Sequence, residues 1–234
     1  MTKSLIFAAT IMGAVSLASA LPVTIDESDF TAGTNTAVLP EGIGVATAGP
    51  AGIKFEKKFL HGYNGYAVGT TQGVGGEIDN DNWIEINFAD AYTIDQLTVA
   101  FLYPQGEFGD VTIPGEMALI FENGTTVPYT LMATSATTAV WTGAGTVLNI
   151  SPAQDYSPGP VGAGMWQIIN PFANDAVTSL RFRANDDLLV GGSADSDFSL
   201  YSLTVSKAVP EPGALSLLGL GLLSLVGLSR RKQK

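Results

Sequence analysis

The chain has 234 residues, no cysteine, 11 Lys or Arg residues and 22 Asp or Glu residues, which gives a formal net charge of −11. The absence of cysteine excludes a disulfide framework, a thiolate nucleophile and a zinc–thiolate site. The acidic surplus repels nucleic acid phosphates, so we expect neither DNA nor RNA as a partner.

Residues 1–20 have the features of a secretory signal peptide. Lys3 supplies a positive charge, an apolar run follows over residues 5–17, and Ala18 and Ala20 form a small-x-small cleavage site. We expect a signal helix that engages the Sec machinery and is cut by signal peptidase after Ala20. The alternative is a retained N-terminal anchor, for which the apolar run is short.

Residues 21–207 are expected to form one exported passenger domain. They hold six cationic and 21 acidic residues, a net charge of −15, which suits solubility outside the cell and could attract calcium. Three of the cations are Lys54, Lys57 and Lys58. These lysines could contact an anionic polysaccharide, or they could mark the solvated face of an edge strand, where lysine discourages sheet-to-sheet pairing. The glycine-rich residues 62–76 predict a long flexible or tightly turning connection.

The rest of the passenger shows the alternation of apolar and polar residues that is typical of strands. Strands are predicted near residues 84–88, 97–101, 117–121, 129–131, 140–141, 147–150, 166–170, 180–183 and 198–205. A turn is predicted at residues 90–92, and Asn123-Gly124 is a strong hairpin signal. The pattern predicts an all-β fold, a β-sandwich or jelly roll.

Several stretches of residues 76–205 carry a resemblance to a known domain. Gly76-Glu77-Ile78, then Trp83-Ile84-Glu85-Ile86-Asn87-Phe88, and the closing strands at 177–182 and 198–205 follow its order of strands. This part resembles a galactose-binding-like jelly-roll domain. The resemblance implies binding of carbohydrate, such as an extracellular polysaccharide, through loops at one end of a sandwich, often with a structural calcium ion. It identifies no ligand residue.

Two acidic loops are candidates for calcium binding, through Asp79 and Asp81 in one and Asp195 and Asp197 in the other. Calcium takes six to eight oxygen ligands, mostly from loops. The first loop is not an EF-hand, because Ile84 stands where that motif needs glycine. The alternative is turn chemistry, in which Asp and Asn bond to their own backbone. No other cofactor is expected.

Catalysis has little support in the sequence. His61 is the single histidine, and no Gly-x-Ser-x-Gly motif is present. Carboxylate pairs are plentiful, so a glycoside hydrolase stays an alternative. We expect a protein that is not an enzyme.

Aromatic residues offer another means of binding, because sugar rings stack on them. Tyr63, Tyr66, Tyr103, Tyr156 and Trp166 lie in or beside predicted loops, where they could stack on sugars or plug the ends of the core. Trp83 and Trp141 lie in predicted strands and are expected in the core.

Residues 208–234 combine three features in a fixed order. Val209, Pro210, Glu211 and Pro212 form a stiff, extended segment. Residues 213–229 carry no charge, and as a helix they would reach roughly 25 Å, slightly less than a hydrocarbon core of about 30 Å. Arg230, Arg231 and Lys232 follow, which predicts a cytoplasmic end. We therefore expect one short transmembrane helix with a basic stop.

This tail is similar to the PEP-CTERM sorting signal. The resemblance implies recognition by an exosortase, a membrane-embedded cysteine transpeptidase, and cleavage near the Pro-Glu-Pro; the alternative is a tail anchor that is never processed. The expected protein is exported to the bacterial cell envelope or an extracellular matrix, after transient anchoring in the inner membrane, and serves adhesion, glycan binding or matrix organisation. The alternatives are a secreted calcium-dependent polysaccharide hydrolase and a purely structural surface protein.

Overall fold

The computed structural model describes residues 21–60, 65–73, 75–79, 81–105, 115–151, 164–185 and 196–208. The strands are β1 (Val23–Asp26), β2 (Thr36–Val38), β3 (Gly44–Gly49), β4 (Phe55–Leu60), β5 (Gly65–Thr70), β6 (Trp83–Ala100), β7 (Met117–Glu122), β8 (Tyr129–Ser135), β9 (Thr138–Trp141), β10 (Thr146–Asn149), β11 (Trp166–Ile169), β12 (Val177–Ala184) and β13 (Ser199–Lys207). Two 3₁₀ turns, η1 (Glu27–Asp29) and η2 (Pro40–Gly42), complete the described elements. The expected all-β class is confirmed.

The expected helices fall outside this part of the chain. The signal helix within residues 1–20 and the membrane helix at 213–229 lie beyond the described residues. Among the residues that the structure does describe, no helix has the length and apolar character to cross a membrane.

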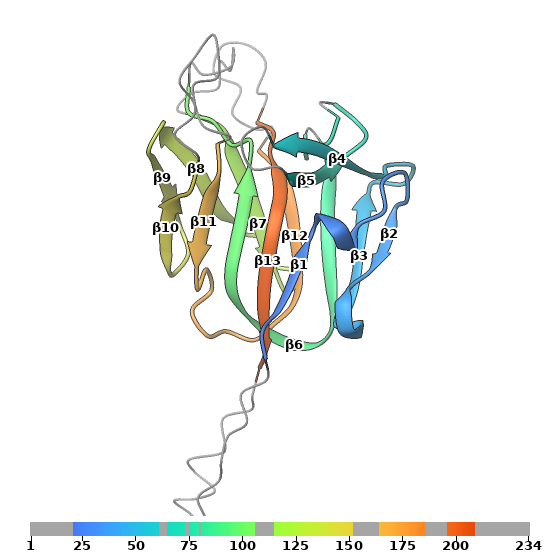
Figure 1. Cartoon of the computed structure of the whole chain (residues 1–234). Coiled ribbons are helices and arrows are strands. Elements are labelled where there is room, and N and C mark those ends of the chain that lie inside the picture. Colours follow the sequence, from blue (N-terminus) through green and yellow to red (C-terminus); the bar gives the residue numbers. More distant parts are fainter. Residues whose placement is uncertain are drawn as a thin grey trace, which may run out of the picture.

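All 13 strands belong to one antiparallel sheet, and β6 is the strand that makes it continuous (Figure 1). The first half of β6 pairs with β3 and β12, and the second half pairs with β11 and β13. Between the halves, Ser179 of β12 pairs with Asn87 of β6, while Val177 pairs with Tyr92. Strand β6 therefore has extra residues at this point, and it bends there. The predicted turn at residues 90–92 is therefore a bend inside one long strand, and it does not separate two strands.

The bend folds the sheet so that its two halves share one core. Ile84 and Ile86 from the first half of β6 join Leu97 and Val99 from the second half in a single hydrophobic cluster, each with no exposed surface. Burial of this apolar surface is the main force that holds the halves together. The outward residues of each half are left for solvent or ligands.

The strands predicted from residue 117 onward correspond to β7 to β13. Asn123 and Gly124 both adopt the left-handed conformation, with φ of 50° and 68°, and form a turn that Thr125 N closes on the carbonyl of Glu122. This turn begins a longer connection, because β7 ends at Glu122 and β8 starts at Tyr129, so the predicted two-residue hairpin is not formed. In the glycine-rich segment the prediction is wrong for residues 65–70, which form strand β5. The described residues after β5 do turn tightly, with Gly73 and Gly76 at positive φ. The lysine-bearing strand β4 pairs with β5 and lies at the end of the strand path, as the edge-strand interpretation predicted.

The first and last strands lie side by side, since Val23 of β1 pairs with Val205 of β13. In Figure 1 the end of β13 lies at the bottom of the molecule, and the β4–β5 hairpin lies at the top. Both ends of the passenger therefore leave from one end of the sheet.

Candidate functional site

A hollow of about 360 Å³ lies on the outward face of β6, β12 and β7. Strand alternation creates this face: Leu180 and Phe182 of β12 are buried, so Arg181 and Arg183 point outward. The residues that line the hollow and are used below are Glu85, Phe121, Thr125, Ser179, Arg181 and Arg183.

Arg181, one of the residues that line the hollow, is held by two neighbouring side chains. Its Nε and Nη2 donate to Oε2 of Glu85 at 3.0 and 2.6 Å. Its guanidinium also lies over the indole of Trp83, 4.8 Å from the ring centroid, as in a cation–π contact. The indole in turn lies over Gly49, where an added Cβ would be only 2.1 Å from a ring carbon. Trp83 is thus half-buried on the outer face, and its expected place in the core is wrong.

Arg183 has weaker partners than Arg181. Its Nη2 lies 3.5 Å from the carboxylate of Asp81, whose side chain is 92% exposed. Its Nε is buried and has no hydrogen-bond partner among the described residues. A buried N–H without a partner costs about 1–3 kcal/mol. Because this N–H has almost no exposed surface, it is not available to a ligand in the hollow.

One wall of the hollow is the turn after β7, which Asn123 fixes to β12. Its Oδ1 accepts hydrogen bonds from the backbone N and the hydroxyl of Thr178, at 2.7 and 3.0 Å. Its Nδ2 donates to the carbonyl of Ala176 at 3.2 Å. These bonds fix the turn whose Gly124 and Thr125 line the hollow together with Phe121.

A second polar cluster joins the β4–β5 hairpin to the start of β13. Lys58 on β4 forms an ion pair with Glu77, which is 2% exposed, and its ammonium lies 4.6 Å from the centroid of the Phe101 ring. Burial raises the pKa of Glu77, although Lys58 opposes that shift. Burial, followed by the charge and hydrogen bond of Glu77, raises the pKa of Asp197 to about 8. At neutral pH the two carboxyl groups therefore hold one proton between them.

The structure brings together two of the four residues predicted to bind calcium. Asp79 and Asp197 lie near Glu77, while Asp81 pairs with Arg183 and Asp195 lies outside the described residues. Within the described ranges, no group of three or more His, Cys, Asp or Glu residues is arranged to hold a metal ion. Calcium binding stays a prediction.

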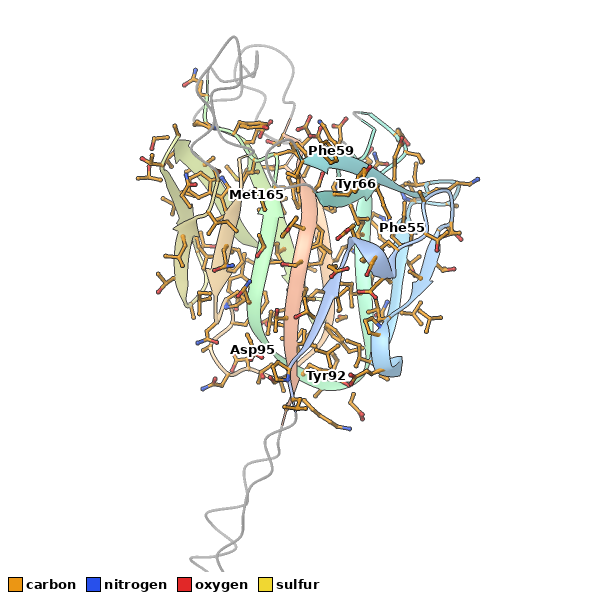
Figure 2. The ribbon with its side chains drawn as sticks, in the orientation of Figure 1. Phe55, Phe59, Tyr66, Tyr92, Asp95 and Met165 are labelled. Carbon is orange, nitrogen blue, oxygen red and sulfur yellow. The ribbon has the colours of Figure 1, made fainter. Side chains whose placement is uncertain are left out.

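The aromatic candidates take different roles. Tyr66 is 44% exposed and packs edge-to-face against Phe59 across the β4–β5 hairpin, with 5.2 Å between ring centroids (Figure 2). Trp166 is buried and donates to the carbonyl of Leu102 at 2.9 Å. Tyr103 packs against the second, smaller hydrophobic cluster, and Trp141 packs partly buried against the main core. His61, Tyr63 and Tyr156 lie outside the described residues.

Sequence reasoning missed the residues of the hollow. Glu85 and Phe121 read as ordinary strand residues, and their meeting with Arg181 depends on pairing between distant strands. One signal was available: Arg181 and Arg183 are two of only six cations in the passenger and stand two residues apart, on one face of a strand.

Comparison with known proteins identifies the tail. Residues 208–232 match the family described as the PEP-CTERM protein-sorting motif. No curated protein and no solved structure matches the chain, so the resemblance to a galactose-binding-like domain has no support. The predicted signal cleavage site at Ala18 and Ala20 lies outside the described residues, as do the sorting residues Val209 to Pro212 and the basic stop at Arg230, Arg231 and Lys232. The chain carries a PEP-CTERM sorting motif at its C-terminal end, and it is an exported protein that an exosortase sorts to the cell surface.

Proposed function

We propose that the passenger binds an extracellular polysaccharide through the hollow on β6, β12 and β7, and that it does so without cutting the polymer. The observation that carries this proposal is the fixed Arg181–Glu85 pair beside Phe121, in a hollow of about 360 Å³. Its role would be adhesion or matrix organisation at the place to which the tail delivers it.

The chemistry of the hollow suits a sugar. A volume of this size lies within the usual range of small-molecule sites, which combine apolar surface with a few fixed polar groups. Phe121 offers apolar surface to the face of a sugar ring, while Glu85, Ser179 and Thr125 offer acceptors and donors for hydroxyl groups. Because Arg181 is already held by Glu85 and Trp83, little side-chain order would be lost on binding.

The carboxylates favour binding over hydrolysis. Glycosidases use two carboxyl groups, about 5–5.5 Å apart in retaining enzymes and about 6.5–9.5 Å apart in inverting ones. Among the described residues that line the hollow, Glu85 is the one carboxylate, and Arg181 bonds to it. Glu77 and Asp197 are hydrogen-bonded to each other, which is too close for either geometry.

The binding test uses the processed protein recovered from its cells and a panel of soluble and insoluble polysaccharides. We expect the unaltered protein to bind at least one polysaccharide, and Phe121→Ala to weaken that binding roughly tenfold. Tyr66→Ala, which removes an exposed aromatic ring at another site, should leave binding unchanged. The panel is also assayed for released reducing ends. Sugar release that Glu85→Gln abolishes would establish the hydrolase, and an absence of all binding would leave the structural alternative.

Mapping of the chain ends tests delivery. Mass spectrometry of the same material should find a mature form that begins at Leu21 and ends near residues 209–212. An intact tail through Lys234 in the membrane fraction would instead show an unprocessed anchor.

A further inference from the structure

We propose that the hollow selects a neutral polysaccharide, and that the Arg181–Glu85 pair recognises two adjacent hydroxyl groups on one of its sugars. This inference rests on the proposed function and names the ligand class of the same site. The main observation is the way in which the pair is joined: Nε and Nη2 of Arg181 both donate to Oε2 of Glu85, at 3.0 and 2.6 Å. The other carboxylate oxygen and the other guanidinium nitrogen are not used in this contact.

Charge in the hollow is balanced within the protein. Arg181 is paired with Glu85, and Arg183 lies 3.5 Å from the carboxylate of Asp81. Residues 21–207 hold six cationic and 21 acidic residues, so most of the surface repels an acidic polymer, and the hollow offers no uncompensated cation to reverse this. A cationic polymer would be drawn to acidic residues over the whole surface rather than to this site. A neutral polymer is therefore the ligand class that the hollow favours.

The pair offers a sugar an acceptor beside several donors. The side chains of Arg181 and Glu85 are 45% and 21% exposed, so both are accessible from the hollow that they line. Oε1 of Glu85 can accept a hydrogen bond from one hydroxyl, while Nη1 of Arg181 donates to the oxygen of the neighbouring hydroxyl. Hydrogen bonds to charged partners are stronger than those between neutral groups. A carboxylate or a sulfate carries no proton for Oε1, so this arrangement favours hydroxyl groups over acidic groups.

Strand pairing places an aromatic ring in line with the pair. Phe121 of β7 is the partner of Arg181 of β12, and Arg181 is the partner of Glu85 of β6, so the three residues form one row across three strands. All three line the hollow. Neighbouring strands lie about 4.8 Å apart, so the row spans roughly 10 Å from Phe121 to Glu85. We therefore expect a chain of sugars to run across the strands, with one ring on Phe121 and the next ring at the pair.

The test measures binding of the processed protein by titration calorimetry to probes of similar length. The neutral probes are oligomers of glucose, galactose and mannose, and the acidic probes are an oligouronate and a sulfated oligosaccharide. We expect at least one neutral probe to bind roughly tenfold more tightly than either acidic probe. Its affinity should change less than about twofold between low and high salt, because no net charge is neutralised on binding. An O-methylated form of the same probe, which lacks hydroxyl donors, should bind roughly tenfold more weakly.

Glu85→Gln tests the pair with little change in side-chain size. The amide oxygen takes the place of Oε2 toward Arg181, so the amide nitrogen faces the ligand and a donor replaces the acceptor. We expect a roughly tenfold loss of affinity for the best neutral probe and almost no further loss for its O-methylated form, which already lacks the hydroxyl donor. The charge of Arg181 is then no longer balanced, so this variant should bind the oligouronate more tightly than the unaltered protein does.

Lys207→Gln is the matched control. It removes another ion pair that a cation makes with a carboxylate of β6, the exposed contact between Lys207 and Asp90, and neither residue lines the hollow. This variant should bind every probe as the unaltered protein does. Thermal unfolding checks that both variants are folded.

The outcomes distinguish this inference from the function on which it rests. Tighter binding of an acidic probe than of every neutral probe would overturn the selection of a neutral ligand and leave polysaccharide binding intact. An equal loss in Lys207→Gln and Glu85→Gln, or independent losses from Glu85→Gln and from O-methylation, would overturn the role of the Arg181–Glu85 pair. No binding of any probe by the unaltered protein would overturn both proposals.

Discussion

The carboxyl group of Glu77 is hydrogen-bonded to that of Asp197, which lies just before β13. Lys58 of β4 forms an ion pair with Glu77. The two contacts connect the β4–β5 hairpin to a strand at the centre of the sheet. The carboxyl groups of Glu77 and Asp197 are both largely buried and hold a proton between them. The presence of this proton should make the stability of the fold depend on pH.

Stability should fall as the pH rises from about 4 to about 8. The folded pKa of Asp197 is about 8, against an ordinary value of 3.8, so the folded chain binds more protons than the unfolded chain in this window. The stabilisation is complete below the unfolded pKa and is lost as pH rises through the folded pKa. Thermal unfolding at pH 5, 6, 7 and 8 should show a progressive fall in midpoint. Asp197→Asn, which retains a donor toward Glu77 without a titrating proton, should flatten the profile. An unchanged slope in this variant would contradict the assignment.

Calcium should compete with this proton. A Ca²⁺ ion held by Asp79 and Asp197, two of the predicted ligands, would need both as carboxylates. Binding would then release the proton of Asp197 and strengthen with pH. We expect millimolar Ca²⁺ to raise the unfolding midpoint more at pH 8 than at pH 5, and Asp79→Asn to remove the effect. If Ca²⁺ shifts the midpoint at neither pH, the predicted site is wrong.

Gly69→Ala should destabilise the passenger by about 1–3 kcal/mol. A Cβ at Gly69 would lie 2.3 Å from the backbone carbonyl of Gly76 and 2.4 Å from Cα of Glu77, and neither backbone atom can move aside easily. Gly75→Ala is the control, because its Cβ would meet only the mobile carboxylate end of Glu56, at 3.2 Å. Denaturant unfolding gives both values, and similar stabilities for the two variants would contradict the close approach of the backbones.

The aromatic pair of the β4–β5 hairpin should contribute to stability rather than to ligand binding. Phe59 and Tyr66 are cross-strand partners that pack edge-to-face, an arrangement worth about 0.5–1.5 kcal/mol beyond the area that it buries. A double-mutant cycle with Phe59→Ala and Tyr66→Ala should give a coupling free energy in this range. Val127→Ala, at a side chain that is 77% exposed, should have little effect. A coupling near zero, together with lost polysaccharide binding, would make the pair a sugar platform instead.

The sequence predicts the second half of the passenger better than the first, and residue size is the reason. From residue 84 onward the inward positions are large, as at Ile84, Ile86 and Phe182, so alternation is easy to see. The early strands bury small side chains, such as Ala46 and Ala67, in segments rich in Thr, Ala and Gly. Such residues show little contrast between buried and exposed positions, which is why β2, β3 and β5 were missed. The four-residue strand β1 was missed as well, although it buries Ile25.

The site residues were harder to predict because they meet through strand pairing. Arg181 reaches Glu85 only because β12 lies beside the first half of β6, and Glu77 meets Asp197 because the next residues, Ile78 and Phe198, pair with each other. No local pattern encodes either pairing. The tail is the opposite case: its prolines, apolar run and basic residues are contiguous, so that the sorting motif could be recognised without any fold.

The position of β13 has a mechanical consequence for a surface protein. This strand leads directly to the sorting tail, and it pairs with β6 on one side and with β1 and β5 on the other. A pull along the axis of β13 from beyond Ala208 would load many of these hydrogen bonds together, in shear, instead of opening them one at a time. The strand nearest the point of attachment is thus clamped on both sides, a geometry that resists extraction by flow or by a bound polymer under tension.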